Sequence, residues 1–179
     1  MPGLTYRLAT EADIPAIATL MERAIESLQR PFLSSAQVMA SRLSMGLDTQ
    51  LIADRTYFLV EQDGVPVGCG GWSYRATLYG GDHSAALRDV RTLDPARDAA
   101  RIRARYTDPA YVRRGIGRLV LALCEDAARA AGFRRVEMMA TLAGEPLYLA
   151  CGYQPIERVM KMAETGPAVP GVRMGKDLP

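Results

Sequence analysis

The chain has 179 residues, of which 49% are hydrophobic and 23% are charged. This composition excludes extended low-complexity disorder and predicts a single globular domain, residues 1–179, with enough apolar material for a sizeable core. The formal net charge of +2 excludes the strong basic excess that is typical of nucleic-acid-binding domains.

The basic residues are almost entirely arginine. The chain has 20 arginines, and its only lysines are Lys161 and Lys176. Arginine presents a permanently charged, planar set of donors that suits phosphate and carboxylate groups, whereas lysine is a point charge that burial can neutralise. The scarcity of lysine therefore argues against a mechanism that uses a lysine nucleophile.

The cysteines and the histidine exclude several kinds of site. Cys69, Cys124 and Cys151 stand far apart, and His83 is the only histidine. A structural zinc site needs four clustered ligands, so we expect neither a metal site nor a disulfide framework. The N-terminus lacks a signal-peptide core, and no apolar run approaches the roughly 20 residues of a membrane span. We therefore expect a cytoplasmic protein with no membrane partner.

Hydrophobic spacing in the first half of the chain predicts helices followed by a hairpin. Thr10 and Asp13 have the spacing of a helix cap, and Pro31 ends the helix that follows. In chain order we predict a strand at residues 6–9, a helix at 11–29, a shorter helix at 35–43, a loop at 45–51, and two strands, 57–61 and 65–74, joined by a turn.

The second half alternates strands and helices. Residues 80–100 are rich in Gly, Asp and Arg and predict a surface excursion, a kind of segment that often binds ligands. Arg101, Arg103 and Arg105 alternate with apolar residues, which predicts a strand at 100–107 with a solvated arginine face. Beyond it we predict an apolar helical stripe at 119–131 that ends at Gly132, a strand at 135–139, a helix at 145–151 and two strands within 153–176.

The most informative segment is the turn from the strand at 100–107 into the following helix. Gly115 and Gly117 lie where the helix opens, so several backbone N–H groups and the positive end of the helix converge there. Arg113, Arg114 and Arg118 add charge at the same place. This arrangement predicts a phosphate-binding site.

Two familiar phosphate-binding motifs do not fit this turn. A dinucleotide-binding fingerprint needs a third glycine where Val120 stands, and it normally follows the first strand of a repeating strand–helix series. A P-loop needs Gly-Lys-Ser or Gly-Lys-Thr, and the nearest lysine is Lys161. Both motifs are excluded by the residues themselves.

The segment instead resembles the acetyl-CoA-binding motif of the GNAT superfamily of N-acetyltransferases, Gln/Arg-x-x-Gly-x-Gly/Ala. Gly115, Ile116 and Gly117 fill its last three positions, and Val112 stands where the family has Gln or Arg. A second family signature, a tyrosine followed after three residues by Gly-Tyr, resembles Tyr148 with residues 152–153. Two ordered signatures about 30 residues apart are more specific than either alone.

The resemblance implies a mixed α/β (α+β) fold with a mostly antiparallel central sheet flanked by helices. It implies an acetyl-CoA-dependent N-acetyltransferase, without a metal, that transfers acetyl directly to a small-molecule or peptide amine. A homodimer and a preference for another acyl-CoA are open. The alternative is a non-catalytic acyl-CoA-binding or regulatory domain. The cofactor-binding residues implied are Tyr106, Thr107, Arg113, Arg114, Gly115, Ile116, Gly117 and Arg118. The resemblance also implies that the strand diverges from its neighbour around Tyr106 and Thr107.

By the same resemblance, Tyr148 is the general acid that protonates the departing thiolate. A free tyrosine has a pKa of about 10 and a thiol one of about 8.5, so full proton transfer is uphill by roughly 2 kcal/mol. We therefore expect Tyr148 to donate a hydrogen bond and to regain a proton from the ammonium of the intermediate. Ala143 stands where many members have asparagine, so we expect one cofactor contact to be missing.

The general base that deprotonates the amine is not identified by the sequence. His83, Glu61, Asp82 and a water chain are the alternatives. Glycines and aromatic residues at 68–74 are candidates for the acceptor wall, and Trp72 is equally suited to the core. Cys69 and Cys151 have no neighbouring base, so we expect them to be small buried hydrophobes.

Overall fold

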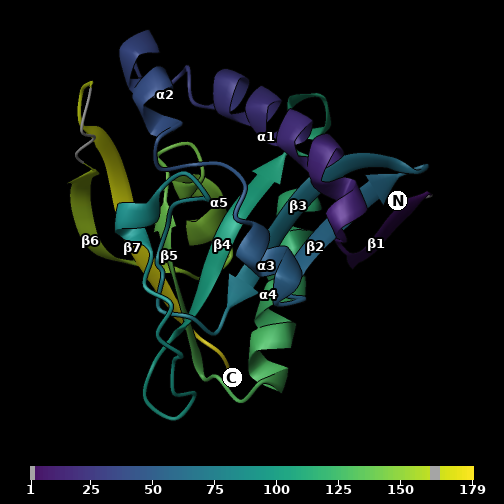
Figure 1. The fold of residues 1–179 in the computed structure, drawn as a ribbon, viewed down its shortest axis with the longest axis vertical. Coiled ribbons are helices and arrows are strands. Elements are labelled where there is room, and N and C mark those ends of the chain that lie inside the picture. Colours follow the sequence, from purple (N-terminus) through teal and green to yellow (C-terminus); the bar gives the residue numbers. More distant parts are fainter. Residues whose placement is uncertain (1–2, 162–165) are drawn as a thin grey trace.

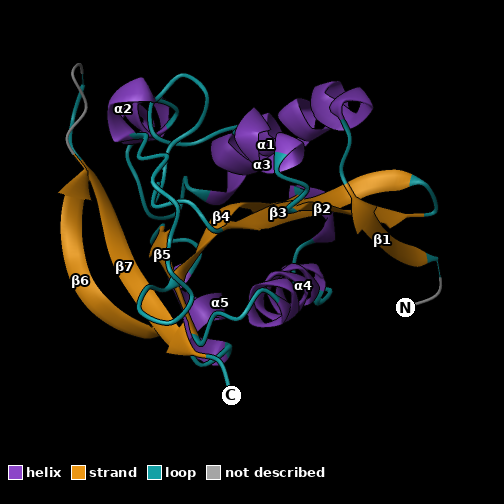
Figure 2. Cartoon of the chain, turned by 60° about the horizontal axis from the view of Figure 1, so that its bottom comes forward, coloured by secondary structure: helices purple, strands orange, loops and turns teal. Residues whose placement is uncertain are grey.

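The computed structural model describes residues 3–161 and 166–179, in which a seven-stranded sheet has helices on both faces (Figures 1 and 2). The spatial order of the strands is β1-β2-β3-β4-β5-β7-β6. Among these described strands, β4 and β5 pair in parallel and every other neighbouring pair is antiparallel. This arrangement confirms the predicted fold class.

The elements follow one another with short connections, apart from the segment between β3 and β4. The strands are β1 (Leu4–Leu8), β2 (Tyr57–Gln62), β3 (Val65–Ser73), β4 (Ala100–Thr107), β5 (Arg135–Ala140), β6 (Gln154–Lys161) and β7 (Val169–Asp177). The helices are α1 (Ile14–Leu28), α2 (Ser35–Ser41), α3 (Thr49–Ala53), α4 (Ile116–Ala130) and α5 (Glu145–Ala150). Residues 162–165, within the predicted C-terminal tail, lie outside the described residues.

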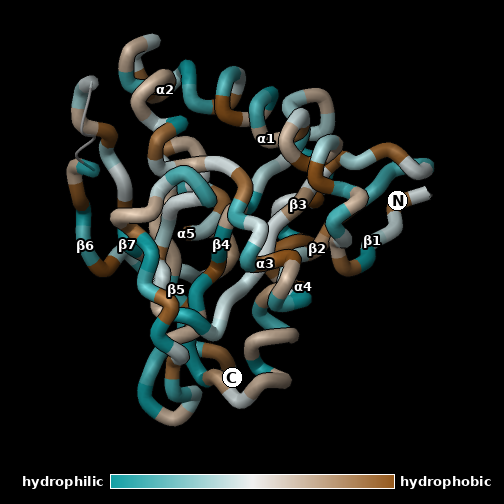
Figure 3. The backbone as a smooth tube through the Cα atoms, viewed as in Figure 1, coloured by the Kyte–Doolittle hydropathy of each residue, from teal (hydrophilic) through white to brown (hydrophobic). Residues whose placement is uncertain are grey.

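The two largest hydrophobic cores among the described residues lie one on each face of the sheet. The apolar stripe of α1, with Ile17 and Leu20, packs on Leu59 and Cys69. On the other face, α4 packs Val120 and Cys124 against the sheet, and Trp72 is part of this core. Figure 3 shows hydrophobic and hydrophilic residues alternating along α1, as a helix with one buried face requires. Because both faces of β3 are covered, residues 67–73 are buried throughout.

Local signals account for several boundaries. The Asp13 carboxylate accepts hydrogen bonds from the N–H and hydroxyl of Thr10, which completes the expected cap. Gly132, with φ +94°, follows α4, as expected of a helix stop. The strands and helices predicted for residues 100–161 are confirmed to within a few residues.

The prediction of a loop over residues 45–51 is wrong, because α3 begins at Thr49. Asp48 caps this short helix by accepting a hydrogen bond from the Gln50 N–H at 3.1 Å. Leu51 and Ile52 are buried in the core beside α1. One and a half turns are too short to display helical periodicity, so the apolar spacing did not indicate a helix.

The prediction of a solvated arginine face on β4 is also wrong. The Arg103 side chain is 3% exposed and forms an ion pair with Asp48, whose side chain is 2% exposed, at 2.9 Å. Arg103 also donates to the carbonyls of Thr77 and Gly80 at 3.2 and 2.7 Å. The segment between β3 and β4 folds over this side of β4 and supplies acceptors to the arginine that the alternation assigned to solvent.

The parallel strands β4 and β5 are hydrogen-bonded only over their first residues and separate beyond them. The two strands pair only at Ala100–Val136 and Arg101–Glu137, and then diverge. In β4, Ala104 has φ +45° and the register with β3 shifts there, which marks a bulge. The Tyr57 hydroxyl donates a hydrogen bond to the carbonyl of Ala104 at 2.6 Å, which holds the bulge. The divergence expected near Tyr106 and Thr107 is therefore present.

No helix in the described part of the chain combines the length and the apolar character that crossing a membrane requires.

Candidate active site

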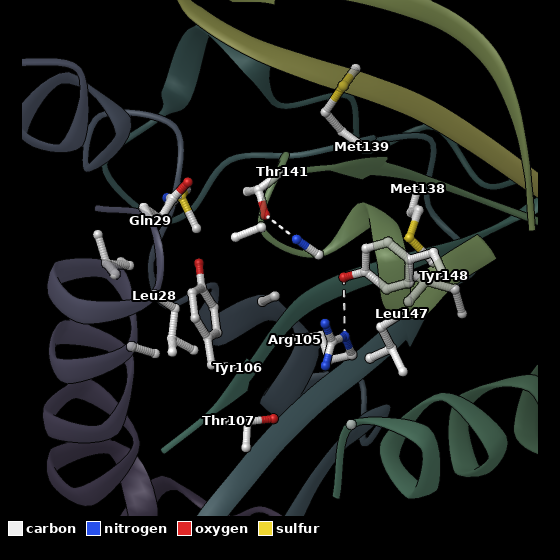
Figure 4. A pocket seen from close by; sticks show the side chains of 18 of the residues that line it. Leu28, Gln29, Arg105, Tyr106, Thr107, Met138, Met139, Thr141, Leu147 and Tyr148 are labelled. Carbon is white, nitrogen blue, oxygen red and sulfur yellow. Dashed lines mark hydrogen bonds between the residues drawn. The ribbon is translucent and has the colours of Figure 1, made fainter. Parts of the chain in front are cut away.

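A cavity of about 790 Å³ opens where β4 and β5 diverge. Its wall comes from the end of α1, from β4, from the turn before α4, from α5 and from the last residue of β6. Figure 4 shows Leu28 and Tyr106 on one side of this space and Leu147 and Tyr148 on the other. The cavity therefore joins elements from both faces of the sheet at the open edge of β4.

The turn into α4 forms one end of this cavity. Arg113 and Gly115 have φ of +64° and +81°, so the chain makes a left-handed turn just before the helix. The first helical bond that returns to the turn runs from the Leu119 N–H to the Gly115 carbonyl at 2.9 Å. The preceding N–H groups of the helix start have no carbonyl one turn earlier, so they form the anion-binding end of the helix.

Neighbouring side chains of the cavity wall leave no room for a Cβ at Gly117. A Cβ added at this position would be 2.6 Å from Arg105 Nη1 and 2.8 Å from Leu147 Cδ2. At Gly115 a Cβ would meet nothing within 4 Å. Glycine is therefore favoured there by the positive φ and not by a lack of space. The two glycines thus have different physical tasks in the same turn.

The three arginines predicted at the turn separate into two groups. Arg113 and Arg118 line the cavity. Arg114 lies beside the Tyr111 ring, with its guanidinium carbon 5.0 Å from the ring centroid, and does not line the cavity. Ile116 and Val112 are also part of the wall. The structure therefore brings seven of the eight predicted cofactor-binding residues to the cavity, with Arg114 directed to Tyr111.

Tyr148 is held by Arg105, which the sequence analysis predicted to face solvent. The Arg105 Nε–H donates a hydrogen bond to the Tyr148 hydroxyl at 3.0 Å, and the guanidinium carbon lies 4.8 Å from the ring centroid (Figure 4). Because the hydroxyl oxygen accepts from Arg105, its own proton remains available to another acceptor. Tyr148 is 7% exposed and packs edge-on against Tyr153. The phenol is thus fixed in one orientation at the cavity wall.

Tyr106 and Thr107 continue the wall along β4. The Tyr106 hydroxyl accepts a hydrogen bond from the Gly46 N–H at 2.9 Å, which ties the segment after α2 to the cavity. Burial raises the pKa of Tyr106 well above its usual value, so this phenol is neutral. Thr107 is the last residue of β4 and pairs with Gly68 of β3.

None of the three side chains proposed as the general base lines the described cavity. His83 contacts the carbonyl of Arg42 and lines a separate, smaller hollow beside α1. Glu61 forms an ion pair with Arg7 at 3.1 Å, near the strand edge at β1. Asp82 accepts hydrogen bonds from Thr49 at 3.0 Å. The structure keeps these groups away from Tyr148, and water is the remaining alternative.

The cysteines do not provide a nucleophile at the cavity. Burial raises the pKa of Cys69 to about 12, and it raises the pKa of Cys124 well above the usual range. Both thiols belong to the hydrophobic cores, as expected for Cys69. Cys151 packs against the core but is only partly buried, because it follows the exposed end of α5, so the expectation of a buried cysteine is confirmed only in part for it.

The charge on the cavity wall has one sign. Its ionised side chains are all basic, and in the described part of the chain no Asp or Glu lines it. Residues 3–161 and 166–179 also hold no group of three His, Cys, Asp or Glu that could bind a metal ion. The basic residues of the wall are Arg103, Arg105, Arg113, Arg118 and Lys161. The sequence indicated two of these, Arg113 and Arg118, as site residues. Arg103, Arg105 and Lys161 reach the cavity through the bulge in β4 and the β6–β7 pairing, neither of which has a signal in the sequence.

Comparisons with known proteins agree with this geometry. The model of the acetyltransferase (GNAT) family matches residues 20–153. A GCN5-related N-acetyltransferase from Rhodopseudomonas palustris has a TM-score of 0.72 and 20% identity, over 99% of this chain and 98% of that one. The protein yncA of Salmonella typhimurium, solved with its cofactor acetyl-CoA, has a TM-score of 0.65 and 18% identity, over 99% and 95%. A search of curated protein sequences gives no match.

Proposed function

The chain belongs to the GNAT family of acetyltransferases, and from that premise we propose that its single domain, residues 1–179, transfers acetyl from acetyl-CoA directly to a small-molecule or peptide amine. The observation that carries the proposal is the cavity at the diverging strands, which joins an anion-binding helix start to an oriented phenol. An acyl-CoA-binding domain without chemistry would need the first of these features and not the second.

The turn before α4 fits the phosphates of acetyl-CoA. Gly117 leaves room for a close approach that a Cβ would fill, and Arg113 and Arg118 supply charge beside the N–H groups of the helix start. We propose that the backbone at Tyr106 and Thr107, in the part of β4 that no longer pairs with β5, binds the pantetheine arm and polarises the acetyl carbonyl. Arg114 stacks on Tyr111, which lines the cavity, and so adds positive charge near the site without contacting it.

Acetyl-CoA supplies a thioester that a neutral amine can attack, and coenzyme A is the leaving group. Tyr148 donates its hydroxyl proton toward the sulfur, while Arg105 holds the hydroxyl oxygen at 3.0 Å. The amine loses one proton in forming the amide, and the thiol gains one, so protons balance over the reaction. We propose that water within the cavity accepts the proton lost by the ammonium of the intermediate and returns a proton to Tyr148, so that the phenol is restored at the end of the reaction.

A thiol-release assay tests this proposal against the non-catalytic alternative. The full chain is incubated with acetyl-CoA and a panel of amines, peptides and amino acids, and free coenzyme A is measured over time. We expect release that depends on at least one acceptor. Tight acetyl-CoA binding with no release for any acceptor would contradict the proposal and support the binding domain.

Substitution of Gly117 tests the cofactor site itself. Gly117→Val is expected to weaken acetyl-CoA binding by about tenfold to a hundredfold, the cost of one or two lost charge-assisted contacts, because its side chain enters the space beside Arg105 and Leu147. Gly117→Ala is expected to have a smaller effect. Calorimetry gives the dissociation constants, and melting curves show that both variants are folded. Unchanged affinity for the valine variant would place the phosphates elsewhere.

A further inference from the structure

Lys161 ends β6 and reaches the cavity from a different part of the fold than the turn before α4. It pairs with Val169 of β7, and its Cε lies 3.4 Å from the Cβ position of Gly171. Gly171 in turn lies next to Met139 at the end of β5. Lys161 therefore enters the cavity from the β6–β7 pair, near Met139, and from a different element than the turn that fits the phosphates.

The ammonium group of Lys161 is buried, and among the described residues it has no carboxylate partner. The residue is 8% exposed, and its contact in the described structure is with the Tyr79 ring, whose centroid lies 5.5 Å from Nζ. No Asp or Glu in the described part of the chain pairs with it, in contrast to Lys176, which binds Glu125 at 2.8 Å. A buried cation without a partner costs folding free energy, so its position in a cavity wall indicates that a bound anion is its partner.

The neighbours of Lys161 cannot supply that anion. Arg103 donates a hydrogen bond to the Gly80 carbonyl, next to Tyr79, and it forms an ion pair with Asp48, so the charge of that carboxylate is already balanced. Burial lowers the pKa of Lys161 to about 8, so at neutral pH the side chain is still mainly protonated. The wall as a whole offers cations and no carboxylate among the described residues, which disfavours polyamines and other multiply charged cationic acceptors.

We propose that Lys161 binds a carboxylate on the acceptor, so that the preferred substrates are amines that also carry a carboxylate, the class of amino acids. The proposal rests on the proposed function, because it needs an acceptor amine in the cavity. Lys161 is a specificity-determining residue here, with no part in proton transfer. It would select the acceptor through binding, so its contribution belongs to KM rather than to kcat.

Matched acceptors test the proposal whichever side chain the preferred amino acid carries. For leucine, phenylalanine and methionine, thiol release is measured with the amino acid, its carboxamide and the amine without the carboxyl carbon. We expect kcat/KM for the best amino acid to exceed that of its two analogues by about tenfold to a hundredfold. The amine of the carboxamide is less basic than that of the amino acid, and the amine without the carboxyl carbon is more basic, so kcat/KM is compared per unprotonated amine.

Variants assign the preference to Lys161. Lys161→Met is expected to lower kcat/KM for the amino acid by about tenfold or more through KM, while Lys161→Arg keeps part of the preference. Arg97→Met, which removes one charge from a residue outside the cavity, is expected to keep all of it. The melting temperature of Lys161→Met is expected to equal or exceed that of the natural chain, since an unpaired buried charge is removed.

Several results would overturn the proposal. Equal kcat/KM for an amino acid and its amine analogue would remove the carboxylate from recognition. Loss of kcat in Lys161→Met with every acceptor would make Lys161 a catalytic group, and weaker acetyl-CoA binding would assign it to the cofactor. An acetyl group found on Lys161 itself would make the lysine a substrate. Absence of thiol release with every acceptor is a different result, because it would contradict the proposed function.

Discussion

Replacement of Tyr148 by phenylalanine is expected to lower kcat by about a hundredfold or more, the usual contribution of a positioned general acid. The phenol is fixed by Arg105 at 3.0 Å and by the ring of Tyr153, so the variant loses the donated proton and little packing. The affinity for acetyl-CoA is expected to stay within about twofold, because an interaction made only during the reaction does not contribute to binding. Single-turnover kinetics together with calorimetry measure the two quantities.

Tyr6→Phe is the matched control for this substitution. Tyr6 lies on β1, is 56% exposed and does not line the cavity, so its kcat is expected to be that of the natural chain. If Tyr148→Phe retained full kcat with the same acceptor, Tyr148 would have no part in the chemistry. If it instead lost acetyl-CoA affinity, its role would be in binding the cofactor.

Replacement of Arg103 by methionine is expected to lower the free energy of unfolding by about 3–5 kcal/mol, the usual cost of removing one partner of a buried ion pair. The two side chains are 3% and 2% exposed, so water cannot replace the arginine at Asp48. Arg103 also holds the carbonyls of Thr77 and Gly80, on either side of residues that line the cavity. Urea unfolding followed by circular dichroism measures the change.

The exposed Arg97 provides the control for Arg103. Its side chain is 86% exposed, and Arg97→Met is expected to change stability by no more than about 0.5 kcal/mol. A similarly small change for Arg103→Met would mean that Asp48 finds another partner, for example Arg88, which already lies 3.2 Å from it. Reduced activity at normal stability would instead show that Arg103 acts mainly by positioning the 77–80 segment.

The sequence predicted the elements whose signals are local. The stripe of α1, the Thr10–Asp13 cap and the glycines around α4 depend on neighbouring residues, so spacing alone indicates them. The helix-start site was predictable for the same reason, since glycines and arginines are adjacent in the chain. The divergence of β4 from β5 came from the family resemblance and not from the residues of either strand.

The rest of the site depends on contacts between distant segments. The bulge at Ala104 turns Arg105 toward Tyr148, 43 residues away, and nothing in the alternation of 100–107 marks it. Asp48 and Arg103 are 55 residues apart, so the alternation could not show that this arginine is buried. Lys161 reaches the cavity only because β6 pairs with β7 and β7 with β5. Such long-range pairing has no signal in a single sequence.

The most direct test of acetyl transfer to an amine is a product measurement. The chain is incubated with isotopically labelled acetyl-CoA and the acceptor that gives the fastest thiol release, and both product and protein are analysed by mass spectrometry. Direct transfer predicts one labelled N-acetyl product for each thiol released and no label on the protein, consistent with the buried Cys69 and Cys124. Thiol release without an acetylated amine, or label that passes through the protein, would contradict the account.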